Sequence, residues 1–143
     1  MFEYDGKVKK IVDGDTIDAY IDLGFNVHVD KRIRFMGIDT PESRTRNKIE
    51  KRFGLLAKAR LKSLLGKRIV LKTQIDRKGQ DMKGKFGRIL GDFMYRGKLV
   101  SKILCEEGHA VPYFGGSKAK IKAKHLKNRQ KLIDLGKIKG PIQ

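Results

Sequence analysis

Residues 32–42 read Arg-Ile-Arg-Phe-Met-Gly-Ile-Asp-Thr-Pro-Glu, and the interpretation of the chain starts from this stretch. It begins as a strand, because Ile33 and Phe35 alternate with polar residues and therefore face one side of a sheet. Gly37 interrupts the alternation. The residue before Pro41 is restricted to extended conformations, which predicts a bend after the strand.

Three charged side chains lie near the end of this predicted strand: Arg34, Asp39 and Glu42. One carboxylate can hold a hard cation, a second can accept a proton from water, and an arginine can bind a phosphate through two parallel hydrogen bonds. Together they would suit a metal-assisted phosphodiesterase. On this stretch alone, a strand that leads into a charged turn is an equally good interpretation.

The chain has 143 residues, of which 39% are hydrophobic and 35% charged, with a formal net charge of +18. This length and composition predict one domain, residues 1–143, with a single core. The charge predicts nucleic acid as the first partner and an anionic membrane as the second. It does not by itself indicate an enzyme, because ribosomal and chromatin proteins share it. The single cysteine, Cys105, excludes an internal disulfide and a cysteine zinc cluster.

The first residues lack a basic region followed by an apolar run, which is the pattern of a signal peptide. No apolar stretch approaches the roughly 18 residues that a membrane span needs. We therefore expect a cytoplasmic protein that does not associate with a membrane. We also expect it to be a monomer.

Apolar alternation predicts five strands, within residues 8–12, 17–23, 27–36, 69–73 and 89–95. The first three form an antiparallel meander, in which Asp15 belongs to an Asp-Gly turn of the kind common in hairpins. Helical spacing predicts one helix before Gly66 and a short one before Gly108. Five strands with a helix after the third match an α+β, mainly β fold, the five-stranded Greek-key barrel of the OB type with three helices.

Two segments are strongly basic: residues 43–52, predicted to be a loop, and a C-terminal helix at about residues 117–136 with Ser117 as its N-cap. The helix has apolar residues at helical spacing: Ala119, Ala123, Leu126 and Ile133. Both segments either contact a phosphate backbone or only increase solubility, and we favour phosphate contact for the helix.

The histidines His28, His109 and His125 are scattered without the spacing of metal ligands. We assign them to structural or solvated positions. Tyr20, Tyr95 and the seven phenylalanines are assigned mainly to the core.

Three motifs together resemble the staphylococcal (micrococcal) nuclease family: Asp-Gly-Asp-Thr at residues 13–16, the stretch from residue 34 to 42, and Lys-Phe-Gly-Arg at residues 85–88. They occur in the family's order at similar spacings, and the similarity covers roughly residues 8–138. The resemblance implies an OB-fold barrel that hydrolyses DNA and RNA phosphodiesters with Ca²⁺, with little sequence specificity, and leaves 3′-phosphates.

The resemblance also implies a metal site. Asp15 and Asp39 match the family's calcium carboxylates, and the backbone carbonyl of Thr40 matches a further ligand. Ca²⁺ accepts several oxygen ligands in flexible geometry, so these groups with water and a phosphate oxygen would suffice. Mg²⁺ and Mn²⁺ are alternative ions.

Arg34 and Arg88 match the two family arginines that grip the scissile phosphate, and Glu42 matches the residue that activates the attacking water, as a base or by positioning it. Fixed guanidinium groups suit the charge that spreads over the phosphoryl oxygens during displacement. Lys85 and Tyr113 match contacts to phosphate and base.

This chain departs from the family's pattern at two positions. Phe86 replaces a tyrosine, and Gly84 stands where an acidic residue is usual. We expect these two changes to affect recognition of the nucleotide and of a terminal phosphate, and not the hydrolysis itself. The missing leader indicates an intracellular, phage-borne or plasmid-borne member.

Two rival functions are open to the same fold. The main one is a non-catalytic nucleic-acid-binding module that has lost its site residues, which the intact set of charged residues disfavours. A protein-binding adaptor is the other, and the excess positive charge argues against it.

Overall fold

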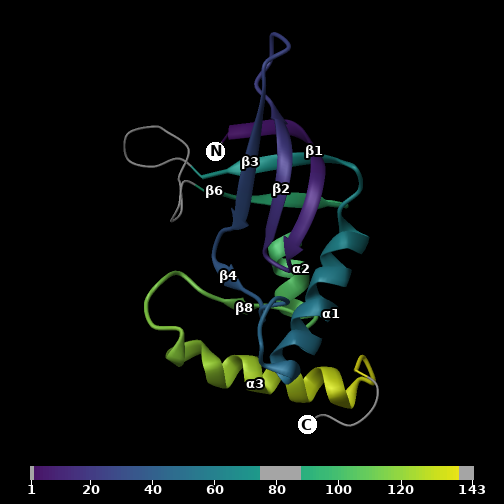
Figure 1. Cartoon of the computed structure of the whole chain (residues 1–143), viewed down its shortest axis with the longest axis vertical. Helices are drawn as coiled ribbons and strands as arrows, with labels where there is room; N and C mark the ends of the chain where they lie inside the picture. The colour runs from purple at the N-terminus through teal and green to yellow at the C-terminus, as the bar shows by residue number, and fades with distance from the viewer. Residues whose placement is uncertain (1, 75–87, 139–143) are drawn as a thin grey trace.

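The computed structural model describes residues 2–74 and 88–138, and its five long strands close into a barrel. They are β1 (Phe2–Asp13), β2 (Thr16–Asp22), β3 (His28–Phe35), β5 (Arg68–Thr73) and β6 (Ile89–Tyr95). Their hydrogen-bonded order is β3-β2-β1-β5-β6, and a parallel pairing of β3 with β6 closes the ring (Figure 1).

Shorter elements surround the barrel. β4 (Ile38–Asp39) pairs with β8 (Val111–Pro112), and β7 (Lys98–Leu99) pairs with β6. The helices are α1 (Lys48–Leu64), α2 (Val100–Glu106) and α3 (Ala119–Asp134), with α3 lying across the end of the molecule opposite the β2–β3 hairpin (Figure 1). The predicted OB-type barrel with three helices is confirmed. None of the helices in the described ranges is both long and apolar enough to cross a membrane.

The core fills the barrel with the inward-facing residues that the alternation predicted. Ile33 and Phe35 of β3 are fully buried, and the Phe35 ring centroid lies 5.2 Å from that of Phe93 on β6. α1 packs its apolar stripe against this core. Its first turn is capped by Asn47, whose side-chain oxygen accepts hydrogen bonds from two backbone N–H groups that have no partner within the helix.

Two strand and helix boundaries differ from the predictions. β1 is 12 residues long and begins at Phe2, because its first half pairs with β5, from Phe2 opposite Thr73 to Lys7 opposite Arg68. This pairing is a long-range contact that the weak local pattern of β1 does not show. α1 begins at Lys48, inside residues 43–52 that were predicted to be a loop, because the Asn47 side chain caps its first turn.

The predicted apolar face of α3 is wrong. Its buried residues are Ile121 and Leu132, whereas the three N-terminal members of the predicted stripe, Ala119, Ala123 and Leu126, are exposed. Buried and partly buried positions recur at 121, 125, 128 and 132, so the inner face includes a histidine and an asparagine that an apolar pattern cannot reveal. The helix begins at residue 119, and the Ser117 hydroxyl still accepts the backbone N–H of Ala119 at 3.2 Å.

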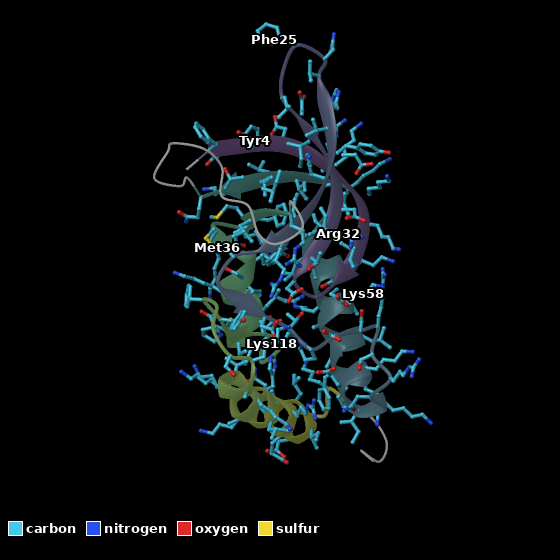
Figure 2. The ribbon with its side chains drawn as sticks, turned by 60° about the vertical axis from the view of Figure 1, so that its left-hand side comes forward. Tyr4, Phe25, Arg32, Met36, Lys58 and Lys118 are labelled. Atoms are coloured by element: carbon cyan, nitrogen blue, oxygen red, sulfur yellow. The ribbon has the colours of Figure 1, made fainter. Side chains whose placement is uncertain are left out.

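Four aromatic residues of the described ranges lie outside the core, against the prediction: Phe2, Tyr20, Phe25 and Phe114. Phe25 is 101% exposed at the tip of the β2–β3 hairpin, which extends away from the rest of the molecule (Figure 2). Phe114 is 87% exposed in the loop after β8. Cys105 is half-buried and packs against the core.

Candidate active site

The turn between β1 and β2 lies beside the end of β3. Thr16 pairs with Arg34 across the β2–β3 ladder, and the backbone N–H of Phe35 donates to the carbonyl of Asp15 at 2.8 Å. The meander therefore brings the first and second motifs into contact, as their positions in the sequence predicted.

The Arg34 guanidinium lies where two carboxylates meet. Its Nη1 is 3.1 Å from Asp15 Oδ2 and its Nη2 is 3.2 Å from Asp39 Oδ1, and Nη1 also donates to the Ile38 carbonyl at 2.9 Å. Asp15 and Asp39 are only 6% and 7% exposed. Two buried negative charges thus share one cation, which makes the three side chains a single electrostatic unit.

The segment that follows β4 is tied to the β1–β2 turn at two points. The Thr40 N–H donates to Asp15 Oδ2 at 3.0 Å, and the Ser43 N–H donates to Asp13 Oδ1 at 3.1 Å, with the Ser43 hydroxyl also donating to Asp13. Glu42 is exposed between these two anchors. Asp13 was not predicted to have a role; its position at the start of the Asp-Gly-Asp turn is the only local signal for one.

Closure of the barrel places Arg88 near Arg34. Arg88 immediately precedes β6, and the parallel pairing sets Ile33 opposite Ile89 and Arg34 opposite Leu90. Both arginines line a cleft of about 540 Å³ together with Tyr113, Phe114 and further residues of the strand end. The structure therefore brings together the two arginines that were predicted to hold one phosphate.

A second cleft, of about 470 Å³, adjoins the first at Arg88. It is lined on β3 by Lys31 and Arg32. Arg32 donates from Nε to Asp18 Oδ1 at 2.8 Å. Asp13 and Asp30 also line this cleft, so its charges are mixed.

The predicted substrate contacts are only partly described. Tyr113 lines the larger cleft and donates its hydroxyl to the carbonyl of Gly116 at 2.9 Å. Lys85, with the departures at Gly84 and Phe86, lies outside the described residues.

α3 and the residue immediately before it, Lys118, each place a side chain near Asp39. His125 Nε2 lies 2.9 Å from Asp39 Oδ2, and Lys118 Nζ lies 3.7 Å from Asp39 Oδ1. Burial by itself raises the pKa of Asp39, but the His125 hydrogen bond and the charges of Lys118 and Arg34 outweigh burial and hold the pKa below its ordinary value. Asp39 is therefore an ionised acceptor at neutral pH. Of the two positions predicted for His125, structural or solvated, the structure excludes the solvated one, because the side chain is only 14% exposed and contacts Asp39.

The residues around Arg34 fit a hard divalent cation. Asp15 and Asp39 offer buried carboxylate oxygens directed at a common positive charge, and the Thr40 hydroxyl oxygen is buried without a hydrogen-bond partner. Oxygen donors of this kind suit Ca²⁺, Mg²⁺ or Mn²⁺. Within residues 2–74 and 88–138, no group of three or more His, Cys, Asp or Glu side chains is arranged to hold a metal. A bound ion would therefore take its remaining ligands from backbone, water or substrate.

The chain matches a known protein family. The family model described as "Staphylococcal nuclease homologue" matches residues 32–133, which is most of the chain. The chain belongs to the staphylococcal nuclease family. The matched range includes the β3 end, Arg88 and most of α3, so all the elements that surround Arg34 except the β1–β2 turn fall within it.

Three curated relatives are each 34% identical to this staphylococcal nuclease homologue. Endonuclease YhcR of Bacillus subtilis (strain 168) matches over 78% of this chain and 9% of its own length. The SPbeta prophage-derived endonuclease YokF of the same strain matches over 74% and 33%, and Protein ParB of Escherichia coli over 70% and 47%. The chain therefore spans less than half the length of each of these relatives.

Proposed function

We propose that the chain is a metal-dependent nuclease that hydrolyses phosphodiester bonds of DNA, RNA or both, with little sequence specificity. The observation that carries the proposal is the Arg34 guanidinium held between two buried carboxylates in the cleft that also contains Arg88. Membership of the staphylococcal nuclease family, and two relatives named as endonucleases, support the same activity.

The two arginines would bind the scissile phosphate. Each guanidinium offers a planar set of N–H donors that matches phosphate oxygens, and their positions are fixed by the paired strands β3 and β6. Arg34 is already oriented by its bonds to Asp15 and Asp39, so it loses little conformational freedom when a phosphate binds. The pair stabilises the negative charge that grows on the phosphoryl oxygens.

Asp15, Asp39 and the carbonyl of Thr40 are the proposed metal ligands, with Ca²⁺ as the first candidate and Mg²⁺ or Mn²⁺ as alternatives. A bound cation would supply charge stabilisation at the phosphoryl oxygens. Glu42, exposed at the rim between its two anchors, would accept a proton from the attacking water or hold that water in line. The new bond joins the water oxygen to phosphorus, the bond from phosphorus to the 5′-oxygen breaks, and the 5′-oxygen takes up a proton. The products are a 3′-phosphate and a 5′-hydroxyl.

A cleavage assay tests this function. Purified protein is incubated with end-labelled single- and double-stranded DNA and RNA in Ca²⁺, Mg²⁺, Mn²⁺ or EDTA, and we expect internal cleavage that EDTA abolishes. Asp39→Ala should lose activity and also the rise in melting temperature caused by the metal, since an ion that binds only the folded state stabilises it. If the metal raises the melting temperature of wild type and Asp39→Ala equally, Asp39 is not a ligand.

A non-catalytic binding module is the alternative function. It would bind the same nucleic acids without cutting them in any metal. The presence of Asp15, Arg34, Asp39, Glu42 and Arg88 favours the nuclease.

The basic residues of α3 are expected to contact the phosphate backbone. Binding should weaken steeply with salt, and each duplex phosphate contact removed should reduce the log–log slope by about 0.9. Replacing the exposed Lys120, Lys122 and Lys124 with glutamine should therefore flatten the slope without changing sequence preference. Lys118 is left intact because it lies near Asp39.

The matched control for this salt experiment replaces three exposed lysines near the C-terminal end of α1: Lys7, Lys62 and Lys67. Their loss changes the net charge equally, so an effect of total charge alone would appear in both triple variants. Equal slopes for wild type and the α3 variant would mean that α3 only increases solubility.

A further inference from the structure

The inner face of α3 presents polar groups to the site at positions where a packed helix usually carries apolar ones. Ile121 and Leu132 are buried, and between them lie His125 and Asn128. Asn128 Nδ2 donates to the Ala110 carbonyl at 3.0 Å, immediately before β8. His125 reaches across β8 to Asp39 on β4, at 2.9 Å. α3 therefore contacts both strands of the small β4–β8 pair.

Asp39 has little backbone support of its own. β4 is only two residues long, and its ladder partner is the equally short β8, outside the closed barrel. A carboxylate on such a segment can rotate about its side-chain bonds unless other groups fix it. Arg34 holds one oxygen from the barrel side.

His125 holds the other oxygen. An ionised carboxylate only accepts hydrogen bonds, so the 2.9 Å contact requires that Nε2 of His125 donates to Asp39 Oδ2. The side chains of His125 and Asp39 are only 14% and 10% exposed, so water competes weakly for this bond. Asp39 is thus fixed from two sides, by β3 and by α3.

We propose that His125 is a positioning residue: its hydrogen bond fixes the carboxylate of Asp39 beside Arg34 and so strengthens cation binding at this site. The proposal deepens the proposed function and rests on Asp39 as a ligand. Groups that orient a ligand in this way typically contribute a factor of ~10–100 in metal affinity or activity.

Three variants test this role. His125→Ala removes the bond to Asp39. His125→Gln retains an N–H donor on a side chain of similar reach. Asn128→Ala is the matched control, because it removes a hydrogen bond that docks the same helix but contacts the Ala110 carbonyl instead of Asp39.

The primary measurement is the Ca²⁺ dissociation constant by isothermal titration calorimetry, at a temperature where every variant is folded. We expect His125→Ala to weaken binding by ~10–100-fold, His125→Gln to restore most of the affinity, and Asn128→Ala to match wild type even if its melting temperature falls. If His125→Ala binds Ca²⁺ as wild type does, or if both alanine variants weaken it equally, His125 acts only through helix docking and the proposal is overturned.

A second measurement does not depend on the metal. The side-chain signals of Arg34 are followed in ¹⁵N-arginine-labelled, metal-free protein and are assigned by their loss in Arg34→Lys. His125→Ala should increase solvent exchange of the Arg34 guanidinium protons, because a freed Asp39 no longer holds them, whereas Asn128→Ala should not. If the wild-type protein binds no divalent cation, the proposed metal-dependent function is contradicted, but the exchange experiment still decides the role of His125. Equal proton exchange in all variants would overturn the positioning role of His125.

Discussion

Glu42→Gln is expected to lower the rate of single-turnover cleavage by ~10²–10⁴, the range typical of a positioned acid–base group. The substitution preserves size and removes the negative charge, so the water is no longer activated or correctly held. Substrate affinity should stay the same or increase, because a like charge beside the phosphate is lost. The backbone around Glu42 should not change, since its anchors at Thr40 and Ser43 are formed by other side chains.

Single-turnover rates are compared with equilibrium binding measured in EDTA. Glu3→Gln is the matched control, because it changes net charge equally on the exposed start of β1. A Glu42→Gln protein that cuts as fast as wild type would exclude Glu42 from the chemistry. Wild-type protein that binds nucleic acid but never cuts, in every divalent metal tried, would leave the binding module as the function.

Gly54→Ala is expected to lose both stability and activity, although alanine normally stabilises a helix interior by roughly 0.5–1 kcal/mol relative to glycine. A Cβ at Gly54 would lie 2.3 Å from the carbonyl oxygen of Glu42, 2.4 Å from its carbonyl carbon and 2.7 Å from the nitrogen of Ser43. These are backbone atoms, so they cannot rotate away. α1 and the residue 42–43 segment must therefore separate.

Forcing extra atoms into a packed contact costs about 1–3 kcal/mol, and displacing a reacting group by 1 Å can reduce rate ~10²-fold. Denaturant unfolding and single-turnover cleavage measure the two effects. The control is Gly66→Ala, since the nearest atom to a Cβ there is 3.9 Å away. A Gly54→Ala protein as stable and as active as the control would show that the segment after Pro41 does not need its close contact with α1.

The sequence predicted those parts of the site that lie on neighbouring segments. Asp15 lies in the turn between β1 and β2, which pair in one meander with the strand of Arg34, and Asp39 follows that strand closely in the chain. Local alternation and turn residues therefore go far toward bringing them together. The contact of His125 with Asp39 spans 86 positions. It depends on which face α3 turns toward β8, and a pattern based on apolar spacing selected the wrong face.

The first half of β1 was missed for a similar reason. Its residues are weakly apolar, and the strand forms because β5 offers a complete ladder for it, from Phe2 to Lys7. Arg88, in contrast to the first half of β1, was assigned from the sequence, but only by family resemblance. It lies near Arg34 because β3 pairs with β6, and no local sequence pattern reveals that pairing.

The same pairing is also required to assemble the arginine pair that we propose binds the phosphate. β3 and β6 are far apart in the chain and pair as parallel strands. Closing the long loop between them costs conformational entropy, and this cost precedes any stabilisation from the pairing. A nascent or partly unfolded chain in which the β1–β2–β3 meander alone has formed would place Arg34 beside Asp15 but would have no Arg88 near it. Such a chain would lack one of the two guanidinium groups that we propose bind the phosphate. We therefore expect cleavage activity to appear only after β3 and β6 have paired and closed the barrel.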